Sequence, residues 1–184
     1  MRFCWNLVDT TFIGISIRIV CLSDTHGHHD RIQVPDGDVL IHSGDFCHRG
    51  FERDVMAFAA WLDRLPHKHK VVVAGNHDRF FEQKPELAQT YLEPNVIYLQ
   101  DSGCVINGLN FWGAPWQPWF MDWAFNLPRK GTALREKWNL IPFATDVLIT
   151  HGPPHGILDQ VWPSSGGWDS EASIGEHLGC EELR

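Results

Sequence analysis

The sequence predicts a mixed α/β (α+β) fold, and three observations support this prediction. Short β-branched runs end directly in polar loops, which is typical of buried strands. An amphipathic segment joins two of these runs, as in a β–α–β unit with a parallel strand pair. An Asn-Gly pair lies between two further apolar runs and predicts an antiparallel hairpin.

The predicted strands occupy residues 15–22, 39–42, 71–74 and 147–150. Between the second and third, apolar residues recur at i, i+4, i+7, i+8 and i+11, which places them on one face of a helix over residues 51–65. Pro66 ends this helix, because proline cannot continue its hydrogen-bonding pattern. Asn107-Gly108 is the predicted hairpin turn.

A tryptophan-rich segment is less regular. Residues 112, 116, 119 and 123 are tryptophans at helical spacing, but Pro115 and Pro118 exclude a regular helix through the first half. We therefore expect an ordered loop over residues 113–119 and a short helix over residues 120–125. Core packing is the preferred role of the tryptophans, ahead of stacking on a nucleobase or a dimer contact.

Composition limits the class of protein. The 184 residues fit a single domain, residues 1–184, with residues 1–14 as an N-terminal extension. The formal charge of -8 argues against a nucleic-acid polymer as partner, and two divalent cations would cancel half of it. Five scattered cysteines without a Cys-x-x-Cys pair favour a reducing compartment, and no membrane span or signal peptide is recognised. A cytoplasmic location is expected.

The residues that carry chemistry follow the predicted strands. The carboxyl ends of parallel strands meet at one edge of a sheet, where open α/β folds bind ligands. Carboxylate, amide and imidazole donors suit Mn, Fe, Zn or Ni better than calcium or an iron–sulfur cluster. The residues concerned are Asp24, His26, Asp45, Asn76, His77, Asp78 and His151.

Each piece has an ordinary structural interpretation when it stands alone. Asp24 can cap a turn, His26 can be a surface residue, and Gly44-Asp45 is a common turn. His151-Gly-Pro-Pro can be a rigid loop. The occurrence of all four groups in order, each behind an apolar run, favours a metal centre instead.

In this order, the motifs resemble those of the calcineurin-like metallophosphoesterase superfamily, and most closely its metallophosphoesterase-domain-containing branch. The resemblance covers residues 17–184. The motifs that carry it are Ser23-Asp24-Thr25-His26-Gly27, Gly44-Asp45, Gly75-Asn76-His77-Asp78, Gly113-Ala114-Pro115-Trp116, Thr150-His151-Gly152-Pro153-Pro154 and Gly179-Cys180-Glu181-Glu182-Leu183.

The resemblance implies a fold, a cofactor and an activity. The implied fold is a two-sheet β-sandwich flanked by helices. The implied cofactors are two divalent metal ions, and the implied substrate is a small phosphoester, in particular a phosphodiester such as a cyclic nucleotide. A catalytically silent fold that binds a nucleotide or a protein is the alternative.

The resemblance also implies residue roles. Asp24, His26 and Asp45 would hold one metal, and Asp45, Asn76 and His151 the other. His77 would face the substrate, oriented by Asp78. A bridging water would lose a proton near neutral pH and attack the phosphorus, because two cations ~3.5–4 Å apart clamp the attacking and leaving oxygens. His77 would then protonate the leaving oxygen.

One part of the superfamily pattern is missing. The sequence contains no Gly-His-x-His motif, and residues 173–184 have the pattern of a helix start. We therefore expect a truncated C-terminus, missing strands in the second sheet, loss of two metal ligands, and possible self-association through exposed surface.

Five other residues are weaker candidates. His48 and Arg49 could reach a phosphate, but a solvated loop is preferred. His155 could bind metal, but a loop role is again preferred. Cys21 is expected in the core, and no neighbour equips Cys47 as a nucleophile.

Overall fold

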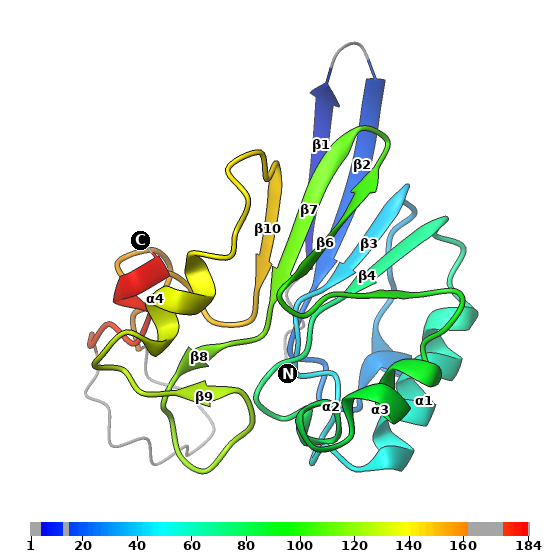
Figure 1. The fold of residues 1–184 in the computed structure, drawn as a ribbon. Helices are drawn as coiled ribbons and strands as arrows, with labels where there is room; N and C mark the ends of the chain where they lie inside the picture. Colours follow the sequence, from blue (N-terminus) through cyan, green and yellow to red (C-terminus); the bar gives the residue numbers. More distant parts are fainter. Residues whose placement is uncertain (1–4, 13–14, 162–174, 184) are drawn as a thin grey trace.

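The computed structural model describes residues 5–12, 15–161 and 175–183 (Figure 1). Its largest sheet has five strands in the order β1-β2-β3-β4-β5. β1 pairs antiparallel with β2, and the remaining neighbours are parallel. The strands are β1 (Trp5–Phe12), β2 (Ile15–Leu22), β3 (Val39–His42), β4 (His69–Val72) and β5 (Ile97–Tyr98).

A second sheet has the order β10-β7-β6, with β10 parallel to β7 and β6 antiparallel to it. Its strands are β6 (Ser102–Ile106), β7 (Leu109–Ala114) and β10 (Val147–Thr150). Asn107 and Gly108 form the predicted hairpin turn, with φ of 51° and 83° as a two-residue primed turn requires. β8 (Gln117–Pro118) and β9 (Asn126–Leu127) form a short parallel pair outside both sheets.

The two faces of the large sheet bury different partners. On one face, Ile19, Ile41 and Val71 pack against Phe111 and Ile149 of the second sheet. On the other face, side chains such as Val20 and Leu40 pack against the helices (Figure 1). The predicted sandwich of two sheets with helices outside is therefore confirmed.

One helix agrees closely with the helix predicted from the sequence. α1 (Glu52–Asp63) occupies most of the predicted range, and its buried residues include Val55, Phe58 and Leu62. The other helices are short: α2 (Arg79–Gln83), α3 (Pro85–Thr90) and α4 (Ala133–Trp138), with single 3-10 turns at His29–Arg31 and Glu181–Leu183. No helix within the described ranges is both long and apolar enough to cross a bilayer.

Three local predictions were wrong. Residues 120–125 form turns rather than a helix, because the Asn126 side chain bonds to the carbonyls of Phe120, Met121 and Trp123. The expected loop over residues 113–119 contains the end of β7 and all of β8. Residues 175–183 contain turns and a 3-10 turn in place of a helix start, while the other residues of that predicted segment lie outside the described ranges.

Candidate metal centre

The loops after β2 and β3 are joined by backbone hydrogen bonds. The Asp24 amide donates to the Gly44 carbonyl at 3.0 Å, and the His26 amide donates to the Asp45 carbonyl at 2.9 Å. The Gly27 amide continues the pattern to the Phe46 carbonyl at 2.8 Å. These bonds extend the parallel pairing beyond the strands, so the first two motifs lie side by side.

The buried carboxylate of Asp45 lies at the centre of the converging loops. Its Oδ2 is 3.7 Å from Nε2 of His26 and 4.0 Å from Nε2 of His77. Its Oδ1 is 3.4 Å from Nε2 of His151 and accepts the His77 amide at 2.8 Å. The two oxygens of one carboxylate therefore face different imidazoles, Oδ1 that of His151 and Oδ2 those of His26 and His77.

His151 has a ring orientation that suits a metal ligand. Its Nδ1 is 3.0 Å from the Ser43 carbonyl, which can only accept a hydrogen bond, so Nδ1 carries the proton in the neutral ring. The Nε2 lone pair then faces Asn76 Oδ1 at 3.0 Å and Asp45 Oδ1. Acceptors that face one another in this way need a positive charge among them, and a divalent cation fits this donor set.

The structure brings together all seven residues predicted for the site, with Asp45 at their centre. Their grouping differs in two respects from the two ligand sets that the resemblance implied. Asp24 forms a possible ligand group with Asp45 and His151. Its Oδ1 is also 3.9 Å from Nε2 of His26. His77 lies with His26 and Asp45, so its Nε2 is also within reach of an ion there. Each group offers one ligand atom per residue, all within 4.8 Å of one another.

The local backbone is unusual at three of the predicted ligands. Asp24, His26 and Asp45 have φ of 55°, 43° and 57°, in the left-handed region that few non-glycine residues adopt. Such conformations cluster at functional sites, where surrounding contacts impose them. Here the turns direct three side chains into one space.

Two glycines make the close approach of the loops possible. A Cβ at Gly75 would lie 2.4 Å from Asp45 Oδ1 and 2.8 Å from His151 Cε1. A Cβ at Gly44 would lie 2.6 Å from His151 Nδ1. Both positions therefore need glycine so that Asp45 and His151 can approach each other.

The calcineurin-like phosphoesterase family model matches residues 17–183. The chain belongs to this family. Metallophosphoesterase domain-containing protein 1 of Homo sapiens is 49% identical over an alignment of 166 positions, which covers 78% of this chain and 51% of that protein; the Mus musculus protein gives the same values. A UPF0046 protein of Caenorhabditis elegans is 38% identical over an alignment of 192 positions, which covers 96% of this chain and 65% of that protein. The chain thus spans about half the length of the two mammalian relatives.

Asp78 does not contact the His77 ring, contrary to the prediction that it orients His77. Its Oδ2 accepts the amides of Asp45 at 2.8 Å and Gly75 at 2.7 Å, and its Oδ1 accepts the Cys47 amide at 2.9 Å. A buried carboxylate with three amide donors joins the loops after β3 and β4. Burial, followed by the nearby charge of Asp45, raises the pKa of Asp78 to about 7.

The His77 ring is held instead by a backbone carbonyl. His77 Nδ1 is 2.9 Å from the His48 carbonyl, which leaves Nε2 directed at the centre. The His48 side chain itself is exposed, as is that of Arg49, in agreement with a solvated loop. Sequence reasoning singled out the side chain of His48, but its carbonyl makes the contact.

Burial and nearby charge shift the pKa values of two histidines of this centre in opposite directions. Burial lowers the pKa of His26. For His151, burial is the largest influence and opposes protonation, but the carboxylates of Asp45 and Asp24 and the Ser43 carbonyl together raise its pKa. The negative field of the two carboxylates therefore favours positive charge beside His151.

The tryptophans have different surroundings. Trp116 packs partly buried against two apolar clusters, as expected. Trp119 is 58% exposed. Trp123 stacks on His77 with ring centroids 4.0 Å apart. Core packing therefore describes Trp116 but not the other two.

The surroundings of the remaining candidate residues do not support a catalytic role. His155 lies in a turn and its ring contacts His177, which pairs with Asp159 at 2.5 Å. Cys47 is fully buried, and burial raises its thiol pKa, so it is not an activated nucleophile. Cys21 packs partly buried against the inter-sheet core, as predicted.

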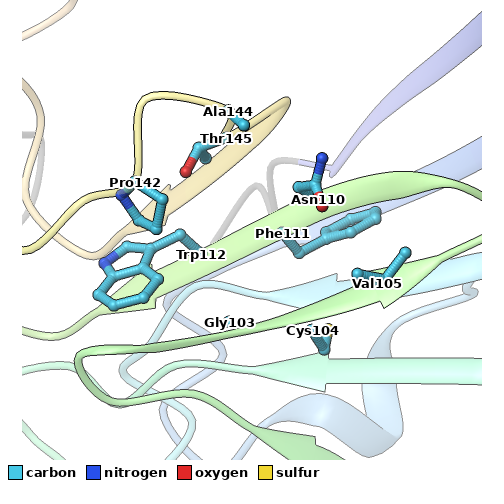
Figure 2. Close-up of a pocket in the computed structure, with 9 residues that line it drawn as sticks. All are labelled: Gly103, Cys104, Val105, Asn110, Phe111, Trp112, Pro142, Ala144 and Thr145. Atoms are coloured by element: carbon cyan, nitrogen blue, oxygen red, sulfur yellow. The ribbon is translucent and has the colours of Figure 1, made fainter.

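A surface pocket of about 300 Å³ is formed by β6, β7 and the segment before β10 (Figure 2). Figure 2 shows the Trp112 indole close to Pro142, with Gly103 and Cys104 on the neighbouring strand. None of the seven predicted site residues lines this pocket. It is therefore separate from the centre around Asp45.

Proposed function

We propose that this chain hydrolyses a phosphoester with two divalent cations held on either side of Asp45. The observation that supports this most strongly is the division of the Asp45 carboxylate, whose Oδ1 faces His151 and whose Oδ2 faces His26 and His77. A shared carboxylate is the usual means of holding two metals close together. Family membership points to the same chemistry.

The residues would divide the work as follows. Asp24, His26 and Asp45 would hold one cation, and Asp45, Asn76 and His151 the other. When bound, such cations supply Lewis acidity and lower the pKa of a coordinated water. The Ser43 carbonyl fixes the His151 ring, and Asp78 fixes the amides of Asp45 and Gly75, so the ligand loops are set before any ion binds.

His77 would act on the substrate. Nδ1 donates its proton to the His48 carbonyl, so Nε2 carries a second proton only when the ring is an imidazolium. In that form Nε2 would donate its proton to the oxygen of the departing group and leave the neutral ring. The metals expected are Mn, Fe, Zn or Ni, from the mixed oxygen and nitrogen donors. We infer a small phosphodiester such as a cyclic nucleotide as substrate, in line with the resemblance to the metallophosphoesterase-domain-containing branch.

A silent binding module is the second candidate. One observation favours it: each group of possible ligands in the described part of the chain gathers only three His or Asp residues. Three protein ligands plus water are nevertheless sufficient for a catalytic metal site. Activity measured with defined metals separates the two candidates.

The decisive measurement is hydrolysis before and after metal removal. Chelated protein should hydrolyse neither bis- nor mono-p-nitrophenyl phosphate, because the proposed reaction depends on cations that lower the pKa of the attacking water. Adding Mn, Ni or Zn should restore hydrolysis more than Mg does, and the diester should react faster than the monoester. Bound metal without hydrolysis of either substrate would favour the silent module.

Replacing His77 with alanine should leave metal content unchanged and slow hydrolysis about 10²-fold or more, the usual scale for a lost acid catalyst. The assay needs a diester with a poor leaving group, since an activated leaving group departs without protonation. With bis-p-nitrophenyl phosphate, the rate of hydrolysis by the same variant should fall much less. Loss of metal in this variant would instead make His77 a ligand, which its position beside His26 and Asp45 allows.

A further inference from the structure

The indole of Trp123 covers one face of the His77 ring. The ring centroids are 4.0 Å apart and the planes are 25° from parallel, which is a stacked arrangement. The His26 and His77 rings form a T-shaped pair, with centroids 4.5 Å apart and planes at 80°. The His77 imidazole therefore contacts two rings, one stacked and one nearly perpendicular.

A hydrogen bond alone does not fix the plane of an imidazole. The bond from Nδ1 to the His48 carbonyl at 2.9 Å sets which nitrogen points into the centre. The ring can still tilt about that bond, and such tilting moves Nε2 relative to Asp45. An indole stacked on the ring restricts this tilt, because the two flat surfaces exclude other orientations.

The segment that carries Trp123 is tied to the centre. The Ala124 amide donates to the Asn76 carbonyl at 3.0 Å, and the Phe125 amide donates to Glu82 Oε1 at 2.7 Å. The guanidinium of Arg79 lies 5.1 Å from the Trp123 ring and donates to the Asp122 carbonyl. The indole is thus placed by bonds to α2 and to the loop that contains His77.

Neighbouring Trp119 provides a contrast. It belongs to the same segment but is 58% exposed. Its side chain has no ring contact among those found in the described part of the chain, whereas Trp123 contacts both His77 and Arg79. Loss of an indole at position 119 is therefore a matched control for loss at position 123.

We propose that Trp123 is a positioning residue that fixes the plane of the His77 imidazole, and so the direction in which Nε2 delivers its proton. This inference rests on the proposed function of His77. Trp123 acts through His77 and not on the substrate. Small misplacements of a catalytic group cost large factors in rate, so the effect should appear wherever proton delivery limits hydrolysis.

The kinetic test compares Trp123→Leu, Trp123→Phe and Trp119→Leu as metal-loaded protein. Trp123→Leu should lower kcat about tenfold or more for a diester with a poor leaving group, and much less for bis-p-nitrophenyl phosphate. Trp123→Phe keeps a flat ring and should recover most of the rate, while Trp119→Leu should match the wild type. Equal losses on both substrates, loss of metal, or a raised KM with unchanged kcat would each overturn the proposal.

A second readout does not depend on activity. In zinc-loaded protein, the carbon-bound ring protons of His77 should show an upfield ring-current shift in NMR spectra, with assignment by comparison with His77→Gln. Trp123→Leu should remove that shift, and Trp119→Leu should keep it. Unchanged His77 resonances in Trp123→Leu would overturn the inference even if the wild type hydrolysed neither substrate, a result that would count against the proposed function alone.

Discussion

Replacing Asp45 with alanine should remove at least one metal ion per chain and nearly all hydrolysis. Asp45 is the residue that the three facing histidines share, so its loss affects both groups of ligands together. The fall in activity should exceed the about 10–100-fold typical of losing an outer partner of a metal ligand. Elemental analysis and the diester assay on the same preparation measure both effects.

Asp45→Asn separates the loss of the carboxylate charge from any change in the backbone conformation. Asparagine tolerates the left-handed φ of 57° and keeps an acceptor for the His77 amide, but it lacks the negative charge. We expect Asp45→Asn to fold like the wild type and still lose metal. Wild-type metal content and rate in either variant would disprove the bridging role of Asp45.

Gly75→Ala should also lower metal content and activity, although glycine contributes no ligand. The new Cβ would meet the Asp45 amide nitrogen at 2.5 Å and its Oδ1 at 2.4 Å. Both contacts are too short for the present structure, so Asp45 must move away from His151. We expect metal content to fall and activity to drop about 10²-fold, the scale associated with displacing a reacting group by about 1 Å.

Gly152→Ala tests whether any added methyl group near the site has this effect. A Cβ at Gly152, beside His151, would meet only the Gln117 Cβ at 3.7 Å, which is an ordinary contact. This variant should keep its metals and most of its activity. If Gly75→Ala behaves like Gly152→Ala in metal titration and assay, the close packing around Asp45 does not matter for binding.

Much of the scaffold could be predicted from the apolar pattern. The bounds of β2, β3 and β10 agree with the predicted ranges, because these strands consist of short β-branched runs that end at polar residues. β4 begins two residues earlier than predicted, since His69 and Lys70 pair in the sheet although they are polar. The predicted strand also included Val73 and Ala74, which follow the end of β4 and are buried.

The parts of the site that escaped prediction depend on backbone atoms. The sequence shows that Asp78 follows His77. It does not show that three backbone amides donate to the Asp78 carboxylate and direct it toward the loops. The carbonyl of His48 could not be predicted as the partner of His77, because every residue has a carbonyl. Trp123 was noticed for its spacing, yet its contact with His77 depends on the turn that Asn126 stabilises.

The left-handed conformations of Asp24, His26 and Asp45 have a consequence for how this sequence can change. Glycine at each position would relieve a backbone cost on the order of 1 kcal/mol, so selection for thermal stability alone would favour it. The same replacement removes a carboxylate or an imidazole from the centre. Selection for stability therefore favours glycine at these three positions, whereas selection for activity favours the present side chains. A lineage released from selection for catalysis should lose these side chains early.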